Sequence, residues 1–289
     1  MAPGKGKGTG QRNAWLLHVV LILLSCLFLF PLVWMISTSL KPEMETMAQP
    51  PTWIPSHAQW GNFHDAFTYG RKELGYIPFL VYGRNTVILC LLTVAGAVLS
   101  NALVAYAFAR MRWPGRDLFF AITLATMMVP FPVIMVPVYG LFRSLGWIGT
   151  FRPLWVPAWF GGAFNIFLLR QFFRTLPFEL SEAARIDGCS EWQIFRQIIL
   201  PLSKPALAVV ALFTFMGTWN EFLQPLIYLQ YQHTFTLSVG LQAFQSQHGG
   251  TQWSILMAAS TMVIAPVIVI FFFAQKQFIQ GIAVTGLKG

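Results

Sequence analysis

The stretch that decides the fold is residues 15–40, WLLHVVLILLSCLFLFPLVWMISTSL, which contain no Asp, Glu, Lys or Arg. As a helix, this run is long enough to cross the ~30 Å hydrocarbon core of a bilayer, which takes about 20 residues. A cleavable signal peptide is the alternative, since a basic stretch precedes the run, but no small-residue cleavage site ends it. We therefore expect residues 15–40 to stay as a membrane helix, after a flexible basic tail at residues 1–14.

Five more apolar runs follow, and the composition suits a lipid environment. The chain is 56% hydrophobic and 10% charged, whereas soluble domains carry about 25% charged residues. The runs lack the alternation of barrel strands, so we expect helices. The sequence thus predicts an all-α polytopic membrane protein, with one transmembrane domain over residues 15–289. Its six spans are expected at residues 15–40, 86–109, 118–141, 154–173, 206–229 and 254–274.

The basic residues predict how the spans are oriented. With the N-terminus inside, 13 of the 19 Lys and Arg fall in inner segments and 6 in outer ones. Cytoplasmic loops of membrane proteins carry such an excess. We therefore expect a multi-pass protein of the cell (inner) membrane, in contact with lipid, with both termini in the cytoplasm. The net charge of +9 comes from short clusters between apolar runs, which argues against a nucleic-acid partner.

One inner loop, residues 177–204, is too long and too structured to be a simple connector. It reads PFELSEAARIDGCSEWQIFRQIILPLSK. Ser181 is placed to cap a first short helix, and Gly188 is placed to end that helix in a left-handed turn. Ser190 is placed to cap a second helix that runs through Ile199. The loop is therefore expected to be a helix–turn–helix at the cytoplasmic surface.

The second helix of this loop is amphipathic. Its apolar side is formed by Ile194, Phe195, Ile198 and Ile199. Pro201 and Pro205 are expected to end the helix before the fifth span. An interfacial helix pair that lies on the bilayer is the simplest interpretation of such a pattern.

Several residues of the loop resemble the cytoplasmic EAA motif of ABC importer permeases. The matching residues are Glu182-Ala183-Ala184, Asp187-Gly188, Ile198 and Leu200-Pro201. In that family the loop sits in a cleft of the ATP-binding subunit, so the resemblance implies that these residues couple the chain to an ATPase. Cys189 departs from the pattern, because alanine is common at its position.

Further blocks resemble the carbohydrate-uptake branch of these permeases, and together the resemblance spans residues 16–289. The blocks are residues 85–86 (NT), 105–110 (AYAFAR), 112–116 (RWPGR), 219–222 (WNEF), 275–281 (QKQFIQG) and 287–289 (LKG). The resemblance implies a type I importer permease that forms the path for a sugar or related polyol. It also implies three kinds of partner: a second permease that is a different chain, two ATP-binding subunits and an external solute-binding protein.

The sequence contains no pattern for catalysis or for a cofactor. It has no GxxxxGK[ST] phosphate-binding loop, so ATP and Mg are expected on the partner ATPase rather than on this chain. It has no His/Cys cluster at metal-ligand spacing and no convergent nucleophile set, which leaves a membrane-embedded enzyme as the weakest interpretation. We expect a transport subunit that is not itself an enzyme.

Polar residues in the fifth span are candidates for the substrate path, because polar groups within a membrane are costly. Thr214, Thr218, Glu221 and Pro225 follow helical spacing, and Asn220 and Gln224 flank them. Pro225 is expected to leave the Glu221 carbonyl free, and Trp219 is a candidate platform for stacking a sugar ring. Packing of helix against helix is the alternative use of this polar face.

A secondary transporter is the main competing function. It would use Glu221 for ion coupling, but it leaves the 177–204 loop unexplained. In the third span, Pro130, Pro132 and Pro137 are typical of a broken helix, which serves either as a gate or as a static kink.

Overall fold

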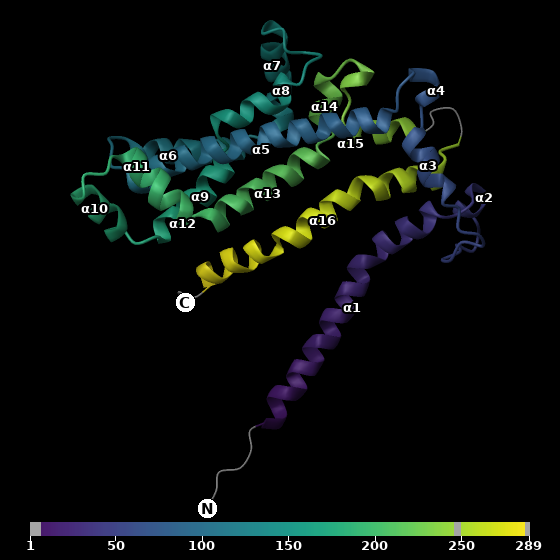
Figure 1. The fold of residues 1–289 in the computed structure, drawn as a ribbon, viewed down its shortest axis with the longest axis horizontal. Coiled ribbons are helices and arrows are strands. Elements are labelled where there is room, and N and C mark those ends of the chain that lie inside the picture. The colour runs from purple at the N-terminus through teal and green to yellow at the C-terminus, as the bar shows by residue number, and fades with distance from the viewer. Residues whose placement is uncertain (1–6, 246–249, 287–289) are drawn as a thin grey trace, which may run out of the picture. The chain divides into compact units, whose positions relative to one another are not determined.

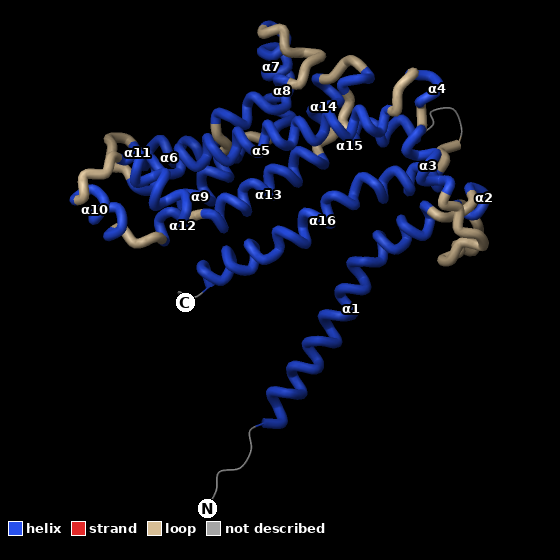
Figure 2. Tube along the Cα trace, in the orientation of Figure 1, coloured by secondary structure: helices blue, strands red, loops and turns tan. Residues whose placement is uncertain are grey.

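The computed structural model describes residues 7–245 and 250–286, so the 287–289 block and the first six residues of the basic tail lie outside it. Every regular element in these residues is a helix (Figure 2), which confirms the all-α prediction. The elements are α1 (Lys7–Ser39), α2 (Glu43–Thr46), α3 (Gly61–Thr68), α4 (Arg71–Leu74), α5 (Pro78–Arg110), α6 (Arg116–Ala125), η1 (Thr126–Met128), α7 (Phe131–Ser144), α8 (Arg152–Trp155), η2 (Val156–Phe160), α9 (Ala163–Thr175), α10 (Glu179–Ile186), α11 (Glu191–Ile194), η3 (Phe195–Ile199), α12 (Leu200–Leu202), α13 (Lys204–Asn220), α14 (Leu223–Tyr228), η4 (Gln232–Thr234), α15 (Leu237–Leu241), η5 (Gln242–Phe244) and α16 (Trp253–Gly286) (Figure 1). η3 is a π-helix, and the other η elements are 3₁₀-helices.

The chain divides into two compact units, which we describe separately. The first holds Met1–Tyr69 and Ala243–Ile264, and the second holds Gly70–Gln242 and Ala265–Gly289. In the first unit, α1 begins at Lys7 and so extends into the stretch that we expected to be a flexible tail. A helix nucleated by the apolar run can add residues at its end at little cost, which accounts for the extension.

The first unit is held together around the end of α1. The side chain of Asn62 donates to the carbonyls of Ser39 (2.9 Å) and Lys41 (3.0 Å). The Lys41 ammonium is buried and lies 4.0 Å from the centre of the Trp34 ring. The carboxylate of Glu43 accepts from the backbone N–H of Trp253 at 2.9 Å, at the start of α16. Free N–H groups at a helix N-terminus favour an acid there, so Glu43 ties this loop to α16.

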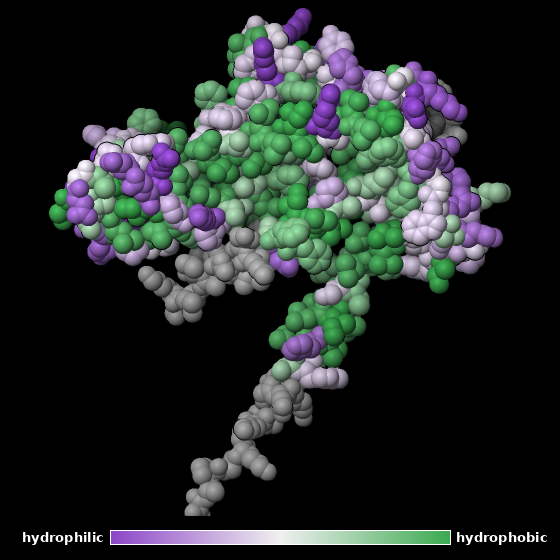
Figure 3. All heavy atoms as spheres, in the orientation of Figure 1, coloured by the Kyte–Doolittle hydropathy of each residue, from purple (hydrophilic) through white to green (hydrophobic). Residues whose placement is uncertain are grey.

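The second unit is built around α5, which packs against α9, α13, η2 and α15. Small side chains on α5, including Ala97, Ala102 and Ala105, are buried and let neighbouring helices approach closely. Other residues of α5, including Leu91 and Leu99, are exposed, as expected for side chains that meet lipid. Figure 3 shows hydrophobic residues over the middle of this unit, and hydrophilic residues gathered where α10 and α11 lie.

Side chains of α5 also satisfy a stretch of backbone that is not α-helical. The hydroxyl of Ser100 donates to the Ala158 carbonyl at 3.0 Å. The Asn101 amide oxygen accepts from the Gly162 N–H at 2.7 Å. Unpaired backbone groups are costly at membrane depth, so these bonds allow the fourth predicted span to break into α8, η2 and α9.

The predicted spans are only partly continuous. Three helices, residues 14–39, 78–110 and 253–275, are long and apolar enough to cross a membrane, and the described residues contain up to five such spans if each bent pair counts as one. The third predicted span bends by 100° between residues 128 and 131. Pro130 is the N-cap of α7 there, and Pro132 lies in its first turn, so both prolines start a new helix instead of kinking one. The count of six spans stays a prediction.

A close approach between α5 and η2 gives a test of this packing. A Cβ added to Gly96 would lie 2.3 Å from the Trp159 ring, whereas a Cβ on Gly217 of α13 would meet nothing within 4 Å. We expect Gly96→Ala to lower the free energy of unfolding by about 1–3 kcal/mol, because the ring must move. Gly217→Ala should be neutral or stabilising, because alanine is the better helix former. Thermal unfolding of the purified chain in detergent measures both, and equal melting temperatures for the two variants would contradict the packing.

Candidate functional site

The candidate site is the segment of residues 177–204, which we call the elbow. Its first helix, α10, begins at Glu179, two residues before the cap that we expected. Ser181 is therefore not the N-cap: it lies in the first turn and is fully buried, and its hydroxyl has no hydrogen-bond partner among residues 7–245 and 250–286. The prediction was wrong because the chain enters the helix at Phe178, and this turns Ser181 toward the bundle.

The turn between the two elbow helices follows the prediction. Gly188 has φ +83°, a left-handed conformation that other residues rarely adopt. The N–H of Cys189 donates to the Ala184 carbonyl at 2.9 Å, and the N–H of Gly188 donates to the Arg185 carbonyl at 3.1 Å. These two bonds form a Schellman motif, which ends α10 and fixes the direction of the next helix.

The second elbow helix begins as predicted and ends later. Ser190 and Gln193 form a capping box, in which the Gln193 side chain accepts from the Ser190 N–H at 2.7 Å. The helix then continues through the π-turn η3 and through α12, so Pro201 does not end it. Pro201 follows directly after the π-turn, in which the Leu200 N–H donates to the Phe195 carbonyl five residues earlier. The chain breaks at Ser203, and the helix axis bends by 78° before α13.

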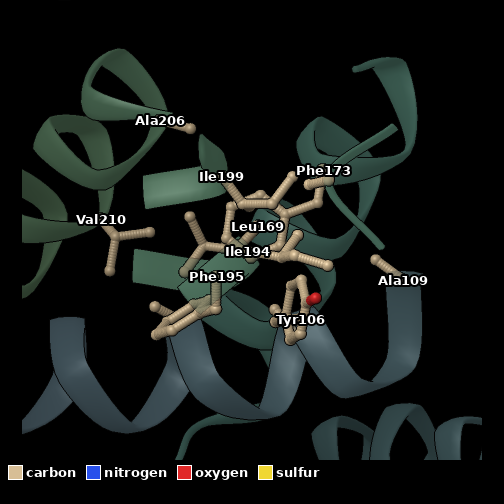
Figure 4. Close-up of a cluster of buried hydrophobic side chains, with 12 residues drawn as sticks. Tyr106, Ala109, Leu169, Phe173, Ile194, Phe195, Ile199, Ala206 and Val210 are labelled. Carbon is tan, nitrogen blue, oxygen red and sulfur yellow. The ribbon is translucent and has the colours of Figure 1, made fainter. Parts of the chain in front are cut away.

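The apolar side of this helix is inserted into the bundle. Ile194, Phe195 and Ile199 are at most 4% exposed, and they pack with residues of α5, α9 and α13 (Figure 4). The cluster also contains Tyr106, Ala109, Leu169, Phe173, Ala206 and Val210. The elbow is therefore anchored on three helices, which differs from the simple interpretation of a helix pair lying on lipid. Burying each large side chain contributes about 1.5–3 kcal/mol.

A polar bridge adds to this anchor. The hydroxyl of Tyr106 donates to Glu191 Oε2 at 2.6 Å, and Arg185 Nε donates to Glu191 Oε1 at 2.7 Å. Glu191 thus joins both elbow helices to α5. The hydrogen bond from Arg185 lowers the pKa of the Glu191 carboxyl, with a further contribution from Tyr106. We did not single out Glu191 from the sequence, because an acid in a first helical turn is ordinary and its partner lies 85 residues away.

Arg110 clamps the entry to the elbow. It is 4% exposed, and its guanidinium donates to the carbonyls of Leu176 (2.7 Å) and Pro177 (3.3 Å). It also lies 4.4 Å from the centre of the Phe178 ring. The sequence placed Arg110 only among the basic inner residues and in the 105–110 block, whereas its hydrogen bonds hold the chain directly after α9, at the C-cap Leu176 and at Pro177.

The EAA-like residues divide between two faces of the elbow. Ala184 is buried, and Ile198 and Leu200 are half-buried. The exposed residues are Glu182, Ala183, Asp187, Gly188 and Pro201. Several large apolar residues of the elbow are also exposed, above all Ile186 at 87% and Trp192 at 58%. The elbow therefore has an inner face packed on the bundle and an outer face that mixes charge with exposed apolar area.

The candidate substrate path is not one helix face. α13 ends at Asn220, Glu221 is extended with ψ 123°, and α14 begins at Leu223. We expected Pro225 to leave the Glu221 carbonyl free within one helix, but the helix ends at Asn220, and the carbonyl accepts from the Ser238 hydroxyl at 2.5 Å. The Glu221 carboxylate accepts from the Gln224 N–H at 3.1 Å, as a helix cap does.

The other candidate residues of the substrate path differ in how exposed they are. Thr214 and Thr218 are half-buried on α13, and Asn220 is exposed, with its amide donating to the Met216 carbonyl at 2.8 Å. Trp219 is only 5% exposed and lies beside Phe215, with ring centroids 5.4 Å apart. This burial leaves no open ring face for stacking a sugar, contrary to our expectation.

Gln224 is the member of the path set that lines a cavity. The cavity has a volume of about 550 Å³ and lies among α7, α8, η2 and α14. Its walls are mostly apolar and include Phe131, Ile134 and Phe160. The buried Tyr228 hydroxyl there has no hydrogen-bond partner in the described part of the chain. Such a lining suits apolar contacts better than it suits a sugar.

A model of one protein family matches residues 101–284, which is well over half of the chain. That family is described as the binding-protein-dependent transport system inner membrane component. The chain belongs to this family. It is therefore an inner-membrane transport subunit, as predicted.

Two relatives and one solved structure agree with membership of this inner-membrane component family. The arabinooligosaccharides transport system permease protein of Halalkalibacterium halodurans is 36% identical over 283 residues, which cover 97% of this chain and 99% of the relative. The sn-glycerol-3-phosphate transport system permease protein of Pectobacterium atrosepticum is 34% identical, covering 92% and 94%. The crystal structure of a bacterial ABC transporter involved in the import of the acidic polysaccharide alginate contains a chain with a TM-score of 0.79 at 22% identity, covering 95% and 99%. This likeness confirms the predicted permease fold.

The hydrogen bonds that Glu191 accepts from Tyr106 and Arg185 should make the stability of this inner-membrane component depend on pH. The pKa of Glu191 is lower in the folded protein, so the bridge stabilises fully above the unfolded pKa of about 4.3 and loses its effect as the pH falls through the folded value. Glu191→Gln should therefore lower the free energy of unfolding at pH 7 by about 1 kcal/mol or less, since the Arg185–Glu191 pair is more than one-third exposed.

The difference between Glu191→Gln and the parent protein should shrink toward pH 4. Melting temperatures of the detergent-solubilised chain at both pH values measure it, with Glu179→Gln as a control on the exposed side of α10. A deficit that stays constant with pH would show that the charge of Glu191 is not what the bridge uses.

Proposed function

We propose that this chain is the permease of an ATP-driven importer, with the elbow gripped by a separate ATP-binding subunit in the cytoplasm. One observation carries the proposal. The inner face of the elbow is packed on α5, α9 and α13, and its outer face leaves Glu182, Ile186 and Trp192 largely exposed. Large exposed apolar residues beside a charge are typical of a surface that meets a partner.

Coupling requires that ATP binding change the free energies of two bundle states by different amounts. The elbow is suited to this task because it is stiff at the turn and anchored at its base. Gly188 and the Schellman bonds set the angle between the helices, and Glu191 bridges them to α5. A push on Glu182 would then reach α5 and α13 rather than be absorbed by the loop.

The solute is a sugar or a related polyol, delivered by an external binding protein. Support comes from the family description, which names binding-protein dependence, and from the relatives named for arabinooligosaccharides and sn-glycerol-3-phosphate. The complete importer contains a second permease, which is a different chain, and two ATPase subunits that hold ATP and Mg. Both termini and the elbow face the cytoplasm.

Gly188 provides the test of coupling. Its added Cβ would meet no atom within 4 Å, so a substitution there acts through the backbone and the exposed surface rather than through packing. We expect Gly188→Asp to abolish uptake and assembly with the ATPase while the chain stays in the membrane. Gly188→Asn is the matched control, because Asn has the same size and tolerates the left-handed conformation without adding charge. Uptake in vesicles and co-purification of the ATPase measure the outcome, and undisturbed assembly of Gly188→Asp would refute the docking surface.

Glu221 separates the importer from a secondary transporter. Its carboxylate accepts a backbone N–H of α14, which is a structural task that an amide oxygen can also perform. We expect Glu221→Gln to keep at least half of the ATP-dependent uptake. In a proton-coupled carrier, Glu221→Gln would abolish transport, and the parent protein would still transport after ATP is removed. Uptake measured with ATP depleted and the proton gradient held therefore decides between the two functions.

A further inference from the structure

A basic pocket lies at the turn between α5 and α6. Its volume is about 380 Å³. Its lining residues are Arg112, Trp113, Gly115, Arg116, Asp117 and Leu118. Two of the six are arginines, and neither the transport path nor the elbow uses them.

α9 brings two more cations to this pocket. Arg170 Nη2 lies 3.9 Å from Asp117 Oδ1, and Arg174 follows one helical turn later, close enough to act electrostatically on both Asp117 and Arg170. Arg170 is held in place, because its Nε donates to the Phe108 carbonyl at 3.3 Å and its guanidinium lies 3.9 Å from the centre of the Phe120 ring.

The charges in the pocket are not balanced by the chain. Three guanidinium groups, of Arg116, Arg170 and Arg174, act on one carboxylate, Asp117, which already accepts from Arg116 Nε at 3.1 Å, and Arg112 adds a fourth cation to the pocket wall. Arg112 and Arg174 are exposed and form no hydrogen bond or ion pair with the part of the chain that the structure describes. Like charges held this close repel one another, so an anion bound here would be stabilised strongly. Guanidinium groups match phosphate oxygens in geometry, with two N–H groups to one phosphate.

The surface beside the pocket indicates where the phosphate comes from. Leu118, Phe119 and Ile122 lie on one side of α6 and are 52–64% exposed. Trp113, which lines the pocket, lies 5.8 Å from Phe119 between ring centroids, and tryptophan is enriched at the headgroup level of membranes. A cationic pocket above an apolar stripe fits a molecule with a phosphate head and acyl tails better than it fits free phosphate.

We propose that this pocket binds the headgroup phosphate of an anionic phospholipid, with an acyl chain along the α6 stripe. The pocket lies near the end of α5 at which Arg110 holds the elbow entry. Assignment of the lipid to the cytoplasmic leaflet therefore rests on the proposed function, whereas binding itself does not. Arg170 joins the pocket to the carbonyl end of α5, so an occupied pocket would hold α5, α6 and α9 together beneath the elbow.

The test titrates the purified full-length chain in detergent with three probes: short-chain phosphatidylglycerol, phosphatidylcholine of the same chain length, and inorganic phosphate. Thermal shift and native mass spectrometry report binding. We expect phosphatidylglycerol to raise the melting temperature and the other two probes to have little effect. Equal effects of the two lipids would overturn the proposal, and an equal effect of inorganic phosphate would overturn the lipid as the source.

Variants locate the site. The double change Arg112→Gln with Arg116→Gln should weaken phosphatidylglycerol binding about thirtyfold, from roughly 1 kcal/mol for each basic residue. Arg143→Gln, at an exposed arginine of α7, should leave binding unchanged. An equal loss in both proteins would show non-specific attraction to basic charge and would overturn the site. The ATPase should still co-purify with the double variant, because the ATPase docks on the elbow and the two substitutions lie in the pocket. Failure of ATPase docking and failure of lipid binding are therefore measured separately.

Discussion

The insertion of Ile194, Phe195 and Ile199 into the cluster of α5, α9 and α13 is the contact on which the arrangement depends. Without it the elbow would be a surface loop, free to move without moving a span. The polar bridge through Glu191 would not replace this contact, because the Arg185–Glu191 pair is more than one-third exposed and such pairs contribute little. The apolar anchor supplies the free energy, and the bridge fixes the direction in which the elbow helices leave the bundle.

α5 has a second task that its apolar sequence conceals. Its few polar side chains hold backbone that would otherwise be unsatisfied at membrane depth. The Asn85 amide donates to the carbonyls of His233 (2.8 Å) and Phe235 (3.0 Å), and the Thr86 hydroxyl accepts from the Leu237 N–H at 2.9 Å. At the other side, Asn101 does the same for the break before α9. The continuous helix α5 thus provides hydrogen-bond partners for the non-helical backbone of the segments that pack against it.

The sequence predicted the features that depend on neighbouring residues better than those that depend on distant partners. The turn at Gly188 and the cap at Ser190 were predictable, because caps and left-handed turns depend on residues within four positions. The break in the third predicted span was also indicated by local residues, because Pro130 and Pro132 lie at the start of α7. The break in the fifth predicted span was not predictable, because it involves a partner far away in the chain, the Ser238 hydroxyl that donates to the Glu221 carbonyl. The burial of Trp219 was missed for the same reason, since a helical pattern does not tell which side a neighbouring helix will cover.

The junction at Ser203 explains how an elbow can act on a distant region. α12 runs into α13 through one buried residue, where the axis bends by 78°. Ile199 before the junction and Val210 after it belong to the same apolar cluster, so the elbow and α13 pack against the same side chains. At its far end α13 stops at Asn220, and the carbonyl of the next residue, Glu221, accepts from the Ser238 hydroxyl. In the proposed importer, a tilt imposed on the elbow would therefore be felt at Glu221 as strain on that bond, rather than be lost along a flexible chain.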